Sequence, residues 1–173
     1  MAGNFFQTKR AARQAVEGVR RSLSSQQVMQ WGGEVQRHLV ALGFFKAAGL
    51  VALYEAESFE VPTAGLRRAG LRVCVPRVEK GTRVLTFLEG ERPVALTDID
   101  VWVVPGVAFT RAGLRLGRGG GYYDSTLPLA RPDAVTVGLA FECCVVDGFP
   151  TEAHDRSVEW LVTETGATPC RPI

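Results

Sequence analysis

The chain of 173 residues has few of the residues that build metal centres or disulfide frameworks. It contains four cysteines but no CxxC pair, and the adjacent Cys143 and Cys144 cannot bond to each other without a strained ring. Its two histidines, His38 and His154, lie far apart and complete no zinc motif. We therefore expect reduced thiols and no zinc site of a known pattern.

Long apolar runs and a strong excess of one charge are also missing. The net charge is only +2, and lysine occurs at just three positions, so that nearly all basic residues are arginines. No run approaches the roughly 20 apolar residues that cross a bilayer, and the opening MAGNFFQTKR lacks the apolar stretch of a cleaved leader. We expect a cytoplasmic protein with small, local anion sites that binds neither nucleic acid nor membranes.

The remaining composition is that of a globular protein. With 46% hydrophobic and 22% charged residues, the chain has enough apolar side chains for a full core. It contains no internal repeat, low-complexity tract or Pro/Ser-rich linker. We therefore expect one domain over residues 1–173.

Two helices are predicted near the amino terminus. Within residues 9–23, apolar residues recur at steps of three and four, namely at Ala12, Val16, Val19 and Leu23. Ser24 and Gln27 then fit a capping box. The second helix is expected to run from there to Gly43, which would be its carboxyl-terminal stop.

Short β-rich runs alternate with turn or helix signals in the rest of the chain. They are LVALYEA from Leu50, LRVCVPRV from Leu71, RVLTFL from Arg83, DVWVVPG from Asp100, VTVGLAF from Val135 and VEWLVTE from Val158. Some are apolar on both faces, as in residues 101–104, which is typical of strands covered on two sides. We predict an α/β fold with a mostly parallel sheet flanked by helices.

A glycine-rich segment, LRLGRGGGYYDST at residues 114–126, follows the strand that ends at Pro105 and Gly106. Ligands collect at the carboxyl ends of strands in such sheets. Glycines permit positive φ and converging N–H groups, while Arg115 and Arg118 match phosphate oxygens. Neither GxxxxGK[ST] nor GxGxxG is present. The segment indicates a phosphate cradle, although glycine content alone equally fits a surface loop anchored by aromatics.

This part of the sequence, VPGVAFTRAGLRLGRGGGYYDSTL at residues 104–127, resembles the signature of the 5-formyltetrahydrofolate cyclo-ligase family, whose members are also called methenyltetrahydrofolate synthetases. The similarity extends, in order, to KRAAR, ALYEAESFEV and VGLAFECCVVDGFPTEAHDRSVEWLVTE, which begin at Lys9, Ala52 and Val137. The resemblance implies the three-layer α/β sandwich of sugar-phosphate isomerases and CoA transferases.

The resemblance also implies a carbon–nitrogen ligase whose partners are 5-formyltetrahydrofolate and ATP, with Mg²⁺ as metal. Phosphorylation of the formyl oxygen and attack by N10 would give 5,10-methenyltetrahydrofolate, ADP and phosphate. We expect a monomer. A family-like nucleotide-binding or regulatory protein without folate turnover is the alternative.

Site residues follow from the resemblance. Contacts to ATP are implied for Lys9, Arg13, Arg115, Gly117, Arg118, Gly119, Gly120, Gly121, Tyr122 and Tyr123. Arg115, Arg118 and Tyr123 are also expected to act in catalysis, and Asp124 and Asp155 to bind the metal. Without the resemblance, the same residues fit blander roles: a solvated helix face for Lys9 and Arg13, a helix N-cap for Asp124 and a loop salt bridge for Asp155.

The folate would be recognised by Glu60, whose carboxylate can accept hydrogen bonds from the pterin, with Glu55 nearby. Without the resemblance, Glu60 would be an exposed loop glutamate. The chain departs from the family pattern in three places, of which Ser125 after Asp124 is the milder change. Thr110 replaces an aspartate, which weakens one acidic contact. The stretch EAESF puts Glu55 and Glu57 beside a wall expected to be apolar, which favours the alternative without folate turnover. His154 is expected to orient its loop only.

Overall fold

The computed structural model describes residues 5–68 and 70–170. Both ends of the expected 1–173 domain, including the first four residues of the opening MAGNFFQTKR, therefore lie outside the described residues. An eight-stranded sheet forms the centre, in the order β10-β9-β8-β5-β1-β2-β3-β4. Its strands are β1 (Val51–Ala52), β2 (Val73–Arg77), β3 (Thr86–Glu89), β4 (Arg92–Val94), β5 (Val101–Val104), β8 (Val135–Leu139), β9 (Trp160–Thr163) and β10 (Gly166–Pro169).

The middle of the sheet is parallel. Strands β9, β8, β5, β1 and β2 pair in parallel, with Val101 opposite Val135 and Val104 opposite Gly138 in the β5–β8 ladder. Antiparallel pairing is confined to the two edges, where β3 and β4 extend one side and β10 the other. All four residues of β5 are buried, as expected for a strand covered on both faces.

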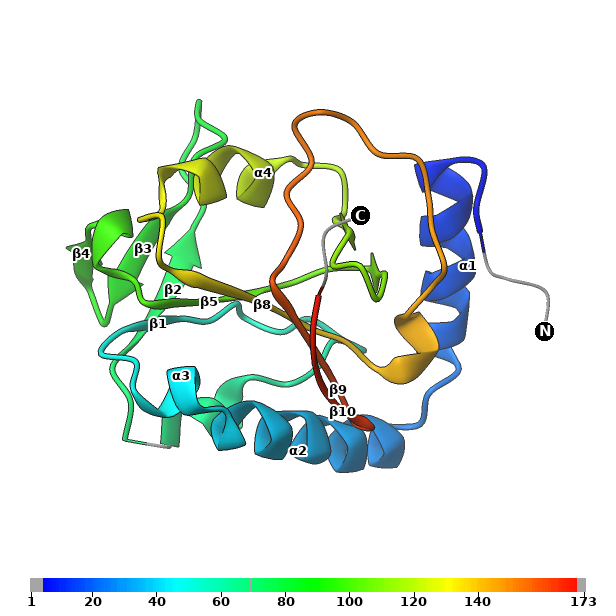
Figure 1. The fold of residues 1–173 in the computed structure, drawn as a ribbon, viewed down its shortest axis with the longest axis horizontal. Coiled ribbons are helices and arrows are strands. Elements are labelled where there is room, and N and C mark those ends of the chain that lie inside the picture. Colours follow the sequence, from blue (N-terminus) through cyan, green and yellow to red (C-terminus); the bar gives the residue numbers. More distant parts are fainter. Residues whose placement is uncertain (1–4, 69, 171–173) are drawn as a thin grey trace.

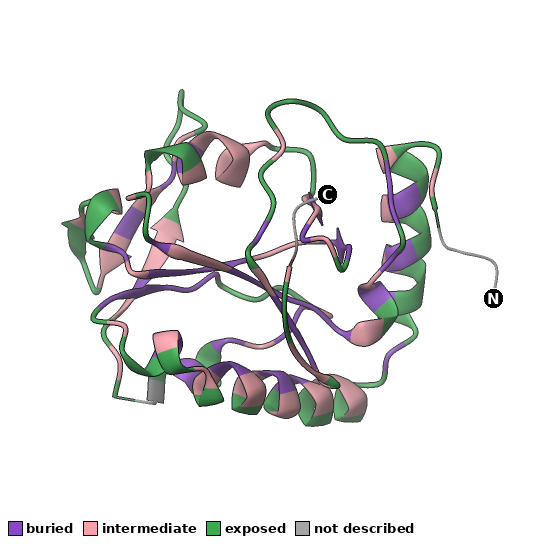
Figure 2. Ribbon diagram, in the orientation of Figure 1, coloured by how far each residue is buried: buried purple, intermediate pink, exposed green. Residues whose placement is uncertain are grey.

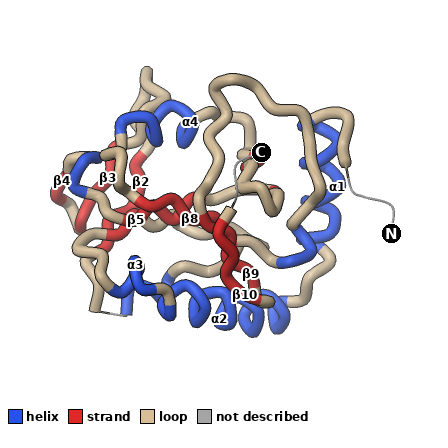
Figure 3. Tube along the Cα trace, in the orientation of Figure 1, coloured by secondary structure: helices blue, strands red, loops and turns tan. Residues whose placement is uncertain are grey.

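Helices cover both faces of the sheet. In Figures 1 and 3, α2 (Ser25–Ala41) and α3 (Gly43–Lys46) lie along one side, α4 (Tyr122–Thr126) lies on the other, and α1 (Lys9–Arg21) stands beside the sheet. The described residues also contain four short 3₁₀ turns: η1 (Ala64–Arg68), η2 (Leu96–Asp98), η3 (Leu127–Leu129) and η4 (Glu142–Cys144). The predicted three-layer α/β arrangement is confirmed. None of the helices in the described ranges is long and apolar enough to span a bilayer.

Helix α1 buries a face that differs from the predicted one at one position. Ala12, Val16 and Leu23 are buried, but Val19 is 42% exposed and Arg20 is buried in its place. With 3.6 residues per turn, Arg20, four residues after Val16, lies closer to the buried face of the helix than Val19, three residues after it. The prediction for Val19 was therefore wrong, and a charged side chain points inward instead.

Helix α2 begins as predicted and ends slightly earlier. The Ser24 side chain accepts the Gln27 N–H, and the Gln27 side chain accepts the Ser24 N–H, so the predicted capping box is present. The helix ends at Ala41, because Leu42 adopts an extended backbone with ψ 135°. Gly43 is therefore not a helix stop but the first residue of α3.

The strands differ from the predicted ones in length and number. The run from Leu50 pairs only at Val51 and Ala52, because the chain then leaves the sheet. Four strands were not predicted: β4, β10, and the separate hairpin β6 (Ala108–Phe109) with β7 (Arg115–Leu116). They are short edge or hairpin strands without a continuous apolar run, so periodicity gives them no signal. Figure 2 shows the buried residues concentrated along the central strands.

Two adjacent glycines of α2 predict opposite mutational effects. A β-carbon at Gly33 would meet nothing within 4 Å, whereas one at Gly32 would lie 2.6 Å from Cδ of Pro62. Gly33→Ala should therefore stabilise the protein by about 1 kcal/mol through helix propensity, and Gly32→Ala should destabilise it by about 1 to 3 kcal/mol through overpacking. Urea denaturation of the two variants measures this. Equal effects of the same sign would contradict the packing of α2 described here.

Candidate active site

A cavity of about 440 Å³ opens at the carboxyl ends of β1, β2 and β5. It brings together all the site residues predicted from the sequence, which come from α1, the segment after β1, strand β7, the glycine-rich loop, α4 and the loop before β9. These are Lys9, Arg13, Glu55, Glu60, Arg115, Gly117, Arg118, Gly119, Gly120, Gly121, Tyr122, Tyr123, Asp124 and Asp155. Residues separated by more than a hundred positions thus share one cavity.

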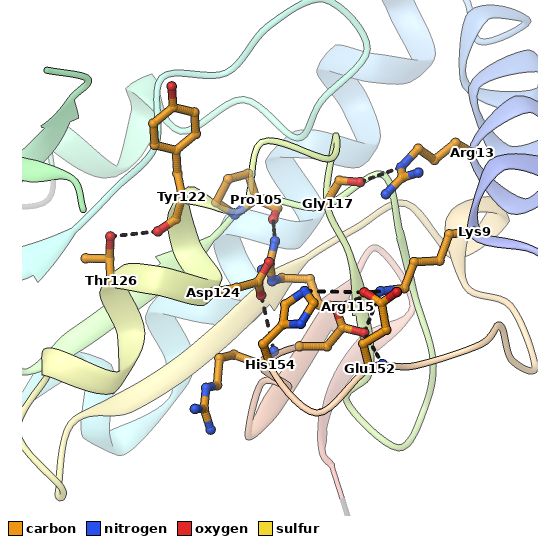
Figure 4. A network of polar contacts seen from close by, with 12 residues as sticks. Lys9, Arg13, Pro105, Arg115, Gly117, Tyr122, Asp124, Thr126, Glu152 and His154 are labelled. Atoms are coloured by element: carbon orange, nitrogen blue, oxygen red, sulfur yellow. Dashed lines mark hydrogen bonds and ion pairs between the residues drawn. The ribbon is translucent and has the colours of Figure 1, made fainter. Parts of the chain in front are cut away.

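Arg115 is a buried strand residue rather than a loop residue. It lies in β7 opposite Phe109, and its side chain is only 4% exposed. Nη2 donates to Oδ1 of Asp124 at 2.5 Å and Nη1 donates to the Pro105 carbonyl at 3.3 Å (Figure 4). Within the described residues its Nε has no partner. A substitution of Arg115 therefore removes a structural ion pair as well as a cationic group of the cavity.

The glycine-rich loop uses its glycines for conformation and for space. Gly119 has φ +103° and Gly121 has φ +71°, values that favour glycine. A β-carbon at Gly117 would lie 2.9 Å from Nη1 of Arg115, so glycine lets the guanidinium pass beneath the loop. Nε of Arg13 donates to the Gly117 carbonyl at 2.8 Å, which ties α1 to the loop (Figure 4).

Asp124 is not a helix N-cap. Gly121 occupies the N-cap position of α4, and Asp124 lies inside the first turn. Its Oδ1 accepts hydrogen bonds from Arg115 and from the backbone N–H of Arg156, at 3.2 Å in the second case. The carboxylate therefore joins the glycine-rich segment to the loop that precedes β9.

Lys9 closes the cavity from the side of α1. Its Nζ lies 2.7 Å from Oδ2 of Asp155 and 3.1 Å from Oε2 of Glu152. Burial alone would lower the pKa of Lys9, but the bonds to the two carboxylates outweigh it and the pKa is raised. Burial likewise would raise the pKa of Asp155, but the bonds from Lys9 and the Glu152 N–H lower it. The loop salt bridge considered for Asp155 is thus present, within the cavity.

The Lys9–Asp155 pair predicts an acid-sensitive contribution to stability. Because the pKa of Asp155 is lowered in the folded protein, its contribution is fully present above the ordinary aspartate range and is lost as pH falls through the lowered value. Asp155→Asn should cost about 1 to 3 kcal/mol at neutral pH, with a difference from wild type that shrinks on acidification. Denaturant titrations across pH measure this.

Asp133→Asn is the matched control for that experiment. Asp133 is also paired with an arginine, Arg131, but its side chain is 79% exposed, so this pair should contribute little at any pH. A penalty for Asp155→Asn that stays constant on acidification would contradict the ion pair.

Glu60 is buried rather than exposed, with a side chain that is 7% exposed at the cavity wall. Its Oε1 accepts a hydrogen bond from Nη2 of Arg118 at 2.8 Å, and its Oε2 accepts the backbone N–H of Glu57 at 2.9 Å. Arg118 also contacts the Glu57 carboxylate. The hydrogen bond to Glu57 raises the pKa of Arg118, and so does the charge of Glu60, although partial burial alone would lower it. One arginine of the glycine-rich loop thus bridges to the segment that carries the predicted folate contact.

Two tyrosines complete the wall. Burial, followed by the charge of Glu60, raises the pKa of Tyr54, whose hydroxyl donates to the Val61 carbonyl at 2.7 Å. Burial also raises the pKa of Tyr123, which lies 5.8 Å below the guanidinium carbon of Arg115. Within the described residues the Tyr123 hydroxyl is buried without a partner. A neutral, unpaired donor at a cavity wall is suited to a ligand oxygen.

The cavity also contains a group of possible metal ligands, of which Glu152 was not predicted from the sequence. Glu152, His154 and Asp155 offer ligand atoms within 4.8 Å of one another, and Glu57 lines the opposite side. The only sequence signal for Glu152 was its place in the same acidic loop as Asp155. Carboxylate oxygens are the ligands that Mg²⁺ prefers, and Glu152 and Asp155 supply them within this group.

Thr110 is not a cavity residue in the structure. It is 2% exposed, and its Oγ1 accepts the Leu114 N–H at 3.1 Å within the turn between β6 and β7. The turn directs this side chain into the protein, and the expectation that Thr110 in place of an aspartate weakens an acidic contact stays a prediction. By contrast, Glu55 and Glu57 do line the cavity, as expected.

Comparisons with known proteins agree with this geometry. The family model described as the 5-formyltetrahydrofolate cyclo-ligase family matches residues 88–164. A 5-formyltetrahydrofolate cyclo-ligase of Haemophilus influenzae is 27% identical over 175 residues, which cover 86% of this chain and 94% of that protein. A mitochondrial one of Arabidopsis thaliana is 38% identical over 84 residues, 43% of this chain and 30% of that protein.

Solved structures show the same similarity over most of the chain. The NMR structure of Aquifex aeolicus 5,10-methenyltetrahydrofolate synthetase superposes with a TM-score of 0.83 at 29% identity, covering 94% of this chain and 93% of that one. A 5,10-methenyltetrahydrofolate synthetase of Mycoplasma pneumoniae superposes with a TM-score of 0.81 at 26% identity, covering 90% and 98%.

Proposed function

Because this chain belongs to the 5-formyltetrahydrofolate cyclo-ligase family and is a ligase, we propose that it converts 5-formyltetrahydrofolate and ATP to 5,10-methenyltetrahydrofolate, ADP and phosphate. The observation that carries the proposal is the single cavity in which Arg118 connects the glycine-rich loop to the buried carboxylate of Glu60. A phosphate-binding segment and a pterin-binding group must lie this close if one atom of the folate is to receive the γ-phosphoryl group.

The proposed chemistry has two steps. The formyl oxygen attacks the γ-phosphorus of ATP, and ADP leaves. N10 then attacks the activated carbon and loses its proton, while the carbon–oxygen bond breaks and phosphate departs. The protein's contribution is to position the reactants and to neutralise charge, which is the main source of catalysis in phosphoryl transfer.

The phosphate end of the cavity supplies positive charge and hydrogen-bond donors. Arg115 and Arg118 would contact phosphate oxygens with fixed charge, Lys9 and Arg13 would contact the nucleotide from α1, and Tyr123 would donate its unpaired hydroxyl. A divalent ion held by Asp124 and Asp155 would neutralise phosphate charge. Both carboxylates pair with cations of this same cavity, so Lys9 and Arg115 would be available to the phosphates where Asp155 and Asp124 hold the metal.

The folate end combines one carboxylate with apolar surface. Tyr54, Pro76, Val78, Leu85 and Leu116 line the cavity beside Glu60. A ring system can pack on such side chains, while the carboxylate accepts hydrogen bonds from the amino and N–H groups of a pterin.

The test is an assay with 5-formyltetrahydrofolate, ATP and magnesium, in which the absorbance of the methenyl product is followed. We expect product only when both ATP and a divalent ion are present. Equal product after chelation with EDTA would refute the metal part of the proposal, and no product under any condition would refute the reaction.

A second candidate is a nucleotide-binding protein without folate turnover. Glu57 favours it, because this carboxylate occupies Arg118 and adds negative charge at a wall that should accept a folate. Calorimetric binding of magnesium ATP, without formation of the methenyl product, would support this candidate.

A further inference from the structure

Arg20 is a buried charge outside the predicted site. It lies in α1 on the inward face that is otherwise apolar, and its side chain is 8% exposed. Burial of a guanidinium is costly unless its donors are paired. Within the described residues, the Arg20 side chain pairs with two consecutive residues, Phe59 and Glu60. Arg20 does not line the large cavity.

The two contacts act on the backbone and on the side chain of the same short segment. Nε of Arg20 donates to the Phe59 carbonyl at 3.0 Å, and Nη2 lies 3.9 Å from Oε1 of Glu60. Phe59 has φ +66° and is the only non-glycine residue in the described chain with a positive φ. A side chain in this conformation is strained and persists only where its surroundings hold it. The bond from Arg20 to its carbonyl is such a restraint.

The Glu60 carboxylate is therefore surrounded by donors from three directions. Arg118 approaches from the cavity, the Glu57 N–H from the neighbouring turn, and Arg20 from behind the wall. Arg118 is half exposed and would turn to a bound phosphate, whereas Arg20 is buried and is held by its contacts to Phe59 and Glu60. Arg20 alone therefore supplies a fixed positive charge for Glu60 when Arg118 is engaged elsewhere.

We propose that Arg20 is a positioning residue for folate recognition: it holds the Phe59 turn and keeps the Glu60 carboxylate directed into the cavity while the nucleotide occupies Arg118. This inference rests on the proposed function, in which Glu60 reads the pterin. It adds a residue that acts through Glu60 without touching either substrate.

The experiment combines Arg20→Met, Glu60→Gln and the double variant, with steady-state kinetics for both substrates. Arg20→Met should raise KM for 5-formyltetrahydrofolate by about tenfold, as expected for loss of a charge-assisted bond. Its kcat and its KM for ATP should stay within about twofold of wild type, because it contacts no reacting group. In the Glu60→Gln background, Arg20→Met should change the folate KM by less than about twofold.

The control is Arg21→Met, which removes the neighbouring arginine from the exposed side of the same helix and should behave as wild type. Three results would overturn the inference. The first is a wild-type folate KM in Arg20→Met, and the second is multiplicative effects on the folate KM in the double variant. The third is a lower kcat together with higher KM values for both substrates, which would report a general structural defect. Failure of the proposed function looks different, because wild type and Arg21→Met would then form no methenyl product either.

Discussion

Replacing Arg118 with methionine should lower kcat/KM for magnesium ATP by about ten- to a hundredfold. The guanidinium lies on the glycine-rich loop and is 48% exposed, so the variant should fold normally and lose no more than about 1 kcal/mol of stability. Loss of charge-assisted bonds to phosphate oxygens accounts for the kinetic effect. Calorimetric titration of magnesium ATP separates weaker binding from slower chemistry.

Arg111→Met is the matched control for Arg118→Met. Arg111 is also 48% exposed and also contacts a glutamate, Glu142, but it does not line the cavity. The control should keep wild-type kinetics. If both variants kept full nucleotide use, Arg118 would be a surface ion-pair residue and the phosphate site would have to be sought elsewhere.

Glu60→Gln should raise KM for 5-formyltetrahydrofolate by at least about tenfold and leave ATP binding unchanged. The contacts of this carboxylate in the structure are all donors, namely Arg118, the Glu57 N–H and Arg20. An amide would have to point its own N–H groups at one of these donors or at the pterin. Because the side chain is buried, a loss of about 1 to 3 kcal/mol in stability should accompany the change.

Glu57→Gln is the control for Glu60→Gln, because Glu57 also bonds to Arg118 but is 66% exposed. It should leave stability nearly unchanged. Titration of 5-formyltetrahydrofolate and of magnesium ATP into both variants, with circular dichroism for folding, completes the comparison. Wild-type folate binding in Glu60→Gln would exclude Glu60 as the residue that recognises the pterin. If Glu57→Gln lost as much folate affinity as Glu60→Gln, the contact to Arg118, and not the position of the Glu60 carboxylate, would determine folate binding.

Much of the fold could be predicted from the sequence because the patterns that specify it span only a few neighbouring residues. The capping box at Ser24 depends on residues three apart, and the buried strand Val101–Val104 depends on a continuous apolar run. The hairpin of β6 and β7 carries no such run, and it converts Arg115 from an expected loop residue into a buried strand residue. Whether an arginine is exposed depends on contacts distant in sequence, which periodicity does not encode.

The site residues were predicted from the resemblance to a known family, which identifies positions in the sequence but not their contacts. Motif matching places Lys9, Glu60 and Asp155 in one cavity without revealing what each contacts. Glu152 was not singled out within the matched stretch and Arg20 lies outside every matched stretch, and only the folded chain brings them to Asp155 and Glu60. A charged residue at the inward phase of an amphipathic helix, as at Arg20, is the one sequence signal that could have identified such a partner.

The bond between Lys9 and Asp155 spans 146 positions of the chain, and this separation has a consequence for synthesis and folding. A polypeptide emerging from the ribosome cannot complete the cavity until the loop before β9 has followed α1 into solution. Closing so long a segment is entropically unfavourable and comes after the nearer strand pairings have formed. The nascent chain can therefore pair its central strands β8, β5, β1 and β2 before the cavity closes, and a chain interrupted ahead of Asp155 lacks one wall of the cavity however well those strands are assembled.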